Sequence, residues 1–221
     1  MPLAAPPLVT ITRQYASGGS EVARRAADAL GWTLIDNAFV DQVARLAGVS
    51  QEEVARREER APGLLERLAR TLAVASPEMF IATSGAGAGG ATPAVEADEA
   101  TLVKLTERVI AEAAREGRAV LVGRGAQALL ATRGNALHVY VVGSKPWRQQ
   151  VAIERLGVSP ADAATTLDDT DHQRDRYVKT HYGRDRQDVS QYDMVLNPER
   201  LGFDGAAQAI VAEARRRGWG S

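Results

Sequence analysis

Residues 8 to 31 read LVTITRQYASGGSEVARRAADALG and predict a buried strand, a glycine-containing turn and an amphipathic helix. Val9 and Ile11 are β-formers, and residues 16–19 suit a tight turn. Apolar residues then recur at helical spacing, at Val22, Ala23, Ala26, Ala27 and Leu30. Such a unit presents backbone amides at the start of the helix, where a phosphate binds. The alternative is an ordinary strand-to-helix connection whose glycines only relieve steric strain.

The turn departs at two positions from the phosphate-binding pattern G-x-x-x-x-G-K-[ST]. Arg13 stands at the first glycine and Gly19 at the lysine, whereas Gly18 and the hydroxyl of Ser20 are kept. The lysine normally places a cation on the terminal phosphates during transfer. Another basic residue must therefore supply that charge, and the candidates are Arg13, Arg174 and Arg184.

Composition predicts a soluble globular chain, and a cytoplasmic location is expected because the lack of cysteine is compatible with a reducing compartment. The 221 residues are 45% hydrophobic and 25% charged, with a net charge of -1, which suits an ordinary packed core. The near-neutral charge argues against a surface built for nucleic acid, and no apolar run is long enough to span a bilayer. The absence of cysteine excludes disulfide scaffolds and cysteine-ligated zinc, and three scattered histidines do not predict a metal site. The opening MPLAAPPL lacks the basic leader and long apolar core of a secretory signal.

Five short apolar stretches predict an α/β fold with a doubly wound parallel sheet. The first strand is followed by residues 33–36 (TLID), 119–123 (AVLVG), 137–142 (LHVYVV) and 193–197 (DMVLN). Helices separate them, including one expected over residues 96–116. Ligands of such sheets bind beyond the carboxyl ends of the strands, where this chain carries Arg13, Asp36, Arg124, Lys145 and Arg148.

The stretch between the second and third expected strands predicts helices and a loop. Ser50 and Glu53 match a capping box, and Leu64, Leu65, Leu68 and Leu72 form an apolar stripe typical of ordinary packing. Residues 84–93 (SGAGAGGATP) predict a flexible surface loop, with a substrate lid as the alternative.

Three stretches resemble the cytidylate kinase-like family, relatives of bacterial cytidylate kinase among the P-loop nucleoside monophosphate kinases. They are residues 11–32 (ITRQYASGGSEVARRAADALGW), 120–130 (VLVGRGAQALL) and 169–202 (DTDHQRDRYVKTHYGRDRQDVSQYDMVLNPERLG). The lysine-less RQYxSGG loop is similar to the loop of this family, and the resemblance covers nearly the whole chain.

The resemblance implies one kinase-like domain over residues 1–221, with the P-loop NTPase type of sheet. Its core would comprise about 8–36, 117–155 and 190–219, with an acceptor-binding insertion at about 37–100 and a lid at about 156–189. The implied reaction is phosphoryl transfer from ATP, with magnesium, to a nucleoside monophosphate, with CMP or dCMP as the expected acceptor. Two alternatives remain: a kinase of another small acceptor, and a nucleotide-binding regulatory protein with weak or no catalysis.

The donor site is expected at the turn, where the backbone of Ser17, Gly18, Gly19, Ser20 and Glu21 would cradle the phosphates of ATP. The Ser20 hydroxyl is the expected magnesium ligand. The expected catalytic groups are the three candidate cations Arg13, Arg174 and Arg184, and the resemblance makes residues 174–186 an arginine-rich lid segment. Arginine suits this task because its planar guanidinium binds phosphate oxygens in pairs. The alternative is a solvated helix face with ion pairs along the helix.

The acceptor site is assigned to Asp36, Arg124, Arg148 and Asp171. Arg124 belongs to the Gly-Arg that the resemblance places on the acceptor, and its alternative is a structural pair with Asp36. Asp36 otherwise caps the next helix, and Arg148 is otherwise a surface charge. His138 is expected to be a packed residue rather than a base. The expected partners are small nucleotides, without nucleic acid or membrane, and the sequence does not determine an oligomeric state.

Overall fold

The computed structural model describes residues 5–36, 39 and 99–219. The chain divides into two compact units, one formed by Met1–Asp36 and Ala114–Ser221 and the other by Asn37–Ala113. Helix α6 (Glu99–Glu116) lies within the stretch expected to be helical and runs from the second unit into the first. The capping box, the leucine stripe and the glycine-rich loop expected over residues 50–93 lie outside the described residues.

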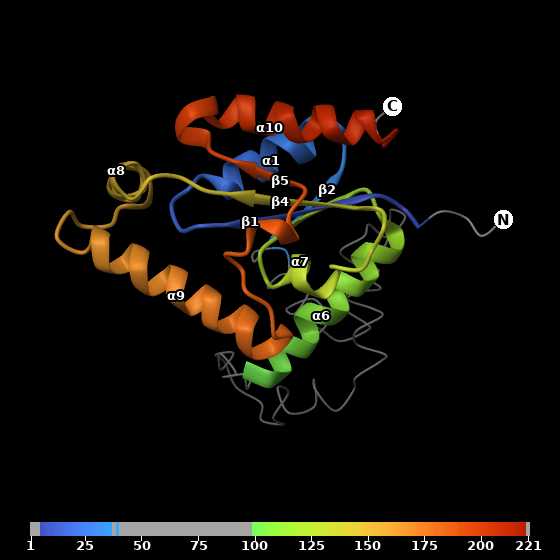
Figure 1. Ribbon diagram of the computed structural model, residues 1–221, viewed down its shortest axis with the longest axis horizontal. Coiled ribbons are helices and arrows are strands. Elements are labelled where there is room, and N and C mark those ends of the chain that lie inside the picture. Colours follow the sequence, from blue (N-terminus) through green and yellow to red (C-terminus); the bar gives the residue numbers. More distant parts are fainter. Residues whose placement is uncertain (1–4, 37–38, 40–98, 220–221) are drawn as a thin grey trace, which may run out of the picture. The chain divides into compact units, whose positions relative to one another are not determined.

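One five-stranded sheet forms the centre of the first unit (Figure 1). Its strands are β1 (Leu8–Arg13), β2 (Thr33–Ile35), β3 (Ala119–Val122), β4 (Ala136–Val141) and β5 (Met194–Leu196). They are ordered β2-β3-β1-β4-β5, and every neighbouring pair is parallel. The prediction of a doubly wound parallel sheet of five strands is therefore confirmed.

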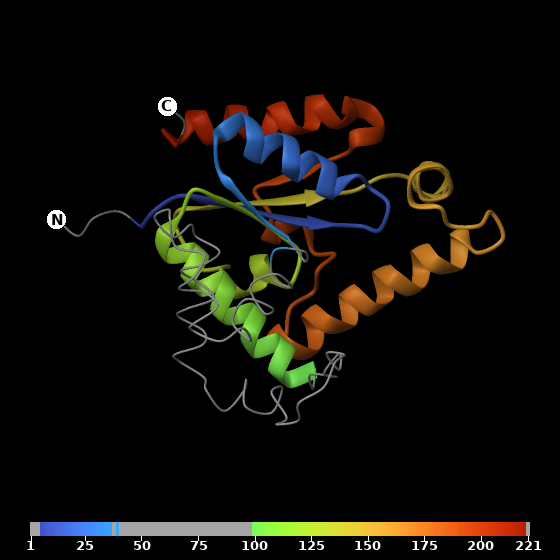
Figure 2. The ribbon, with the colours of Figure 1, turned by 180° about the vertical axis from the view of Figure 1, so that it is seen from behind.

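Helices cover both faces of this sheet because parallel strands need long crossover connections. Helices α1 (Gly19–Leu30) and α10 (Pro198–Arg216) pack side by side on one face, and α7 (Ala126–Leu129) and α9 (Ala163–Tyr182) lie on the other (Figures 1 and 2). Helix α8 (Lys145–Leu156) follows β4 and packs against α9. None of the helices in the described part of the chain is long and apolar enough to cross a membrane.

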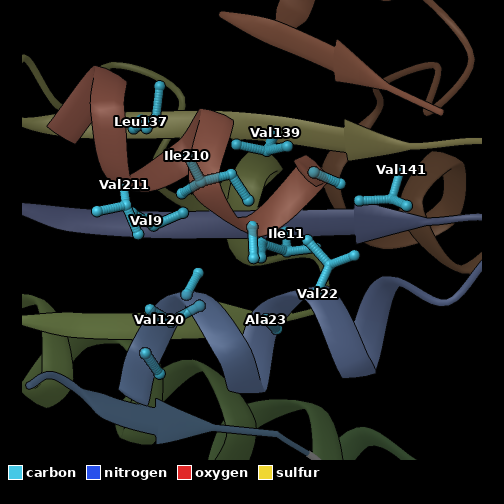
Figure 3. Close-up of a cluster of buried hydrophobic side chains, with 14 of the residues drawn as sticks. Val9, Ile11, Val22, Ala23, Val120, Leu137, Val139, Val141, Ile210 and Val211 are labelled. Atoms are coloured by element: carbon cyan, nitrogen blue, oxygen red, sulfur yellow. The ribbon is translucent and has the colours of Figure 1, made fainter. Parts of the chain in front are cut away.

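The main core lies between the sheet and the pair α1 and α10 (Figure 3). Alternate residues of the central strand, Val9 and Ile11, point into it, and Val22 enters from α1. All three are at most 1% exposed, and burying such a side chain contributes about 1.5–3 kcal/mol. This core fixes α1 against the end of β1 and so sets the position of the turn between them.

The opposite face of β1 carries polar residues that pair across the sheet. Thr10 lies beside His138 of β4, and its Oγ1 is 2.7 Å from His138 Nδ1. Burial lowers the pKa of His138, so the neutral ring is favoured. His138 is thus a packed residue, as the sequence predicts.

Candidate functional site

The turn between β1 and α1 is fixed to the end of β4. The Gln14 amide donates to Val141 O at 3.0 Å, and Gln14 Oε1 accepts from the Gly143 amide at 3.0 Å. The buried Ser17 hydroxyl lies 2.8 Å from Gln14 O and 3.1 Å from Val141 O. Ser17, expected at the donor phosphates, therefore orients the loop through its side chain, and only its backbone remains a candidate contact.

Among the described residues, no side chain caps the N-terminus of α1. Gly18 occupies the cap position with a φ of 78°, and no side chain hydrogen-bonds the first turn. The amides of Gly19 and Ser20 thus open the positive end of the helix, which favours an anion. A Cβ at Gly18 would lie 2.2 Å from Phe203 Cε1, so the ring of Phe203 lies directly against this glycine.

Ser20 and Glu21, also expected at the donor site, differ in their surroundings. Ser20 is exposed at the first turn, where its hydroxyl is accessible to a metal ion bound to phosphates. Glu21 accepts from Arg24 at 2.9 Å and from Arg25 at 2.7 Å, and these two bonds lower its pKa to about 2. The Glu21 carboxylate is therefore paired with arginines of its own helix, α1. The described residues include no cluster of three or more acids or histidines that could hold a metal ion. Magnesium prefers oxygen ligands, and the exposed Ser20 hydroxyl is one oxygen that remains accessible here.

Arg13, the last residue of β1, extends its side chain across the sheet toward the end of β3. A Cβ at Gly123 would lie 1.7 Å from Arg13 Nη1, so the guanidinium rests on the α-carbon of that glycine. Burial, followed by the charges of Arg174, Arg186 and Arg124, lowers the pKa of Arg13 to about 9, against a smaller opposing effect of Asp36. Several positively charged arginines therefore lie close to the Arg13 guanidinium.

Two further guanidinium groups approach the same residue. Arg174 of α9 donates from Nη1 to the backbone oxygen of Arg13 at 3.1 Å, and Arg186 donates to the same oxygen at 2.9 Å. Arg186 is also bound to Asp175 at 2.5 Å and lies 5.9 Å above the ring of Tyr140. Burial lowers the pKa of Arg174, as expected for a cation held out of water.

Asp171 joins α9 to the turn. Its Oδ1 accepts from the Tyr15 amide at 2.8 Å, and its Oδ2 accepts from Arg148 at 2.7 Å. Arg148 is buried and also donates to Tyr15 O at 3.1 Å and to Gly143 O at 3.1 Å. Both residues were expected to bind the acceptor, and the structure gives them bonds that hold the turn between β1 and α1 in place.

Of the remaining expected residues, Arg124 and Asp36 lie near the group of arginines formed by Arg13, Arg174 and Arg186, which we call the arginine cluster. Arg184 lies elsewhere. Arg124 follows β3 with a φ of 54°, and Asp36 follows β2; the charges of both act on Arg13. Arg184 instead donates to Gln191 Oε1 at 2.7 Å, beside the 3-10 turn Val189–Gln191.

Arg186 was not among the expected site residues, although it lies in the predicted lid segment. The contact that places it is its ion pair with Asp175, eleven residues earlier. The two residues do not lie on one helix, because α9 ends before Gly183 and Arg186 follows it. Only the density of arginines in this segment signalled it.

Comparisons with known proteins agree with this architecture. A family model for the cytidylate kinase-like family matches residues 8–200. An uncharacterized protein from Eubacterium ventriosum has a similar structure, with a TM-score of 0.64 and 18% identity, over 95% of this chain and 98% of that one. Shikimate kinase from Acinetobacter baumannii, solved with shikimate, gives a TM-score of 0.50 and 14% identity, over 96% of this chain and 94% of that one. At these identities the two structures show a shared fold, and no curated protein matches the sequence.

Proposed function

Since the chain belongs to the cytidylate kinase-like family, we propose that it transfers the terminal phosphoryl group of ATP to a nucleoside monophosphate, with CMP or dCMP as the acceptor. The family match agrees with the resemblance of the three sequence stretches. The observation that carries the proposal is the convergence of Arg13, Arg174 and Arg186 at the end of β1, next to the bare start of α1.

The charge balance of this cluster favours a polyanion. Five arginines (Arg13, Arg124, Arg148, Arg174 and Arg186) are accompanied by three aspartates (Asp36, Asp171 and Asp175). Asp171 and Asp175 hold guanidinium groups of this cluster, and among the described residues the arginines outnumber these aspartates. Repulsion within the cluster is relieved when negative charge enters, so a substrate with several phosphate charges binds with a favourable electrostatic contribution.

The proposed reaction is an in-line displacement. An oxygen of the acceptor phosphate forms a bond to the γ-phosphorus of ATP, the bond from that phosphorus to the β,γ-bridging oxygen breaks, and ADP leaves with the electron pair. The backbone of Gly18, Gly19 and Ser20 would hold the donor phosphates, and Arg124 would hold the acceptor phosphate. Magnesium bound to the donor would neutralise charge there, with Ser20 as its protein ligand. The protein contributes position and positive charge.

In this proposal Arg148 and Asp171 position the turn rather than touch the substrate. Their bonds to the two backbone atoms of Tyr15 support this role. Arg174 reaches the cluster from α9, so its charge would arrive on the reacting phosphates only with that helix in place.

The test is a transfer assay with γ-labelled ATP against CMP, dCMP, UMP, AMP, GMP and shikimate, with and without magnesium. We expect labelled CDP or dCDP in the presence of magnesium. Binding of ATP without product from any acceptor would identify a nucleotide-binding protein instead, as the glycine at position 19 would permit. Label on another acceptor would keep the kinase reaction and correct the acceptor. Arg216→Ala, an exposed change near the end of α10, is the matched control and should not alter the rate.

A further inference from the structure

The two departures from the phosphate-loop pattern are in physical contact. A Cβ at Gly19 would lie 2.5 Å from the Cβ and 3.0 Å from the Cγ of Arg13. Real carbon atoms do not approach to 2.5 Å, and neither of these atoms is the movable end of a side chain. Position 19 therefore has no room for a side chain while position 13 carries a β-carbon.

Backbone conformation does not explain the glycine at position 19. Gly19 is the first residue of α1 and, unlike Gly18, is not among the residues with positive φ. A helical residue whose φ is not positive can carry a side chain without backbone strain. The close approach of Arg13 is what requires the glycine.

The side chain of Arg13 connects the two halves of the proposed site. Its stem passes the start of α1 at Gly19, and its guanidinium ends on Gly123, which precedes Arg124 after β3. The donor phosphates are assigned to the first of these places and the acceptor phosphate to the second. A phosphoryl group moving between them would pass beside this guanidinium.

We infer that Arg13 is the cation that contacts the transferred phosphoryl group in place of the missing lysine, and that Gly19 is a glycine because the stem of Arg13 fills the space its side chain would need. This inference rests on the proposed function and selects one of the three candidate cations. Arg174 and Arg186 assist by donating to the backbone oxygen of Arg13. Arg13 keeps its protons during the transfer and acts through its charge.

The claim that Arg13 leaves no room for a side chain at position 19 is tested by stability measurements, which do not depend on enzyme activity. Gly19→Ala is introduced into the wild type, into Arg13→Ala, which keeps the β-carbon, and into Arg13→Gly, which removes it. Urea unfolding should show a lower midpoint after Gly19→Ala in the first two backgrounds and no loss in the third. An equal loss in all three backgrounds would overturn the coupling.

The proposed role of Arg13 in transfer is tested by moving the positive charge from position 13 to position 19, where the phosphate-loop pattern has a lysine. Arg13→Gly should lower kcat by at least about 100-fold. The double variant Arg13→Gly/Gly19→Lys should regain at least tenfold over Arg13→Gly, because the lysine then has both room and a role. Arg13→Met, which keeps most of the stem, should be as slow as Arg13→Gly and guards against a folding defect. Melting curves and circular dichroism check that each variant is folded.

Each outcome separates this inference from the proposed function. Wild-type transfer with undiminished kcat in Arg13→Met overturns the role of Arg13 and leaves the kinase activity standing. A folded double variant no faster than Arg13→Gly also overturns it. Absence of transfer by the wild type from ATP to every acceptor overturns the proposed function and the role of Arg13 together, while the urea series still decides the steric coupling.

Discussion

Arg174 and Arg176 lie on the same helix, and only the first reaches the arginine cluster. Arg174 donates to the backbone of Arg13, whereas Arg176 is exposed. We expect Arg174→Ala to lower kcat on the order of 100-fold with a smaller change in ATP binding, because its charge matters most as charge redistributes during transfer. Steady-state kinetics and ATP titration measure the two effects. Arg176→Ala is the control, and equal kinetics for the two variants would remove Arg174 from this role.

Arg124 stands in the left-handed region, with a φ of 54°. Asparagine tolerates this conformation better than alanine does, so Arg124→Asn removes the charge with the least added strain. We expect the KM of the acceptor to rise about tenfold or more, with little change in the KM of ATP. Initial rates with each substrate varied in turn provide the measurement, and an unaltered acceptor KM would contradict the assignment.

The lowered pKa of Arg13 predicts that the rate of the reaction depends on pH. Burial and neighbouring arginines lower its pKa to about 9, so in the free enzyme the charge is lost as the pH rises through about 9. We expect kcat/KM for ATP to decrease above that pH, and the decrease to be absent in Arg13→Met. The pKa of Arg13 is higher in the unfolded chain, so above about pH 9 the contribution of Arg13 to folding stability becomes less unfavourable as the pH rises. A pH–rate profile without a decrease in this range would argue against a charged Arg13 in the reaction.

The Asp171 carboxylate joins helix α9 to the turn between β1 and α1. Asp171 and its partner Arg148 are 16% and 8% exposed, and removing one member of such a buried pair costs about 3–5 kcal/mol. We expect Asp171→Ala to lower the free energy of unfolding by about this amount and to raise the KM of ATP, as measured by urea unfolding and kinetics.

Asp168 is the matched control on the same helix. Its pair with Lys145 has both side chains 48% exposed, and such pairs contribute about 1 kcal/mol or less. Similar losses from Asp168→Ala and Asp171→Ala would show that Asp171 does not hold the turn.

At the level of elements, the sequence predicts the sheet better than the site. Runs such as AVLV and ALHVYV are apolar without alternation because both faces of the sheet are covered, and this pattern identifies buried parallel strands. The start and end of α1 also follow from sequence, since Gly18 and Gly31 both adopt the left-handed conformation. Local patterns suffice where local chemistry decides the structure.

The arrangement of the arginines could not be predicted in the same way. The bonds from Asp171 to Tyr15, and from Arg174 and Arg186 to Arg13, join residues more than 150 positions apart. No period or spacing encodes such contacts. Asp171 and Arg148 were expected at the acceptor, and their bonds to Tyr15, which no sequence spacing predicts, tie them to the turn between β1 and α1.

For the whole molecule, the arginine-rich cluster predicts stabilisation by simple polyphosphates. Inorganic pyrophosphate and tripolyphosphate should raise the Tm, because an anion that binds only the folded state stabilises it by about 2.7 kcal/mol at 100 times its Kd. The shift should shrink as sodium chloride is added, since screening weakens the attraction. Differential scanning calorimetry measures both effects. Arg13→Met should show a reduced shift, and an identical shift in that variant would place the anion elsewhere.

The central position of β1 has a consequence for how the chain acquires its structure. Val9 is hydrogen-bonded between strands that contain Val120 and Leu137, so β1 has neither neighbour until the chain has been synthesised past residue 119. The apolar residues of β1 therefore stay exposed to solvent during translation. Folding is slow because the long segments between β1 and its two neighbouring strands must close. This gives a nascent chain truncated before β4 a strong tendency to aggregate or to engage chaperones.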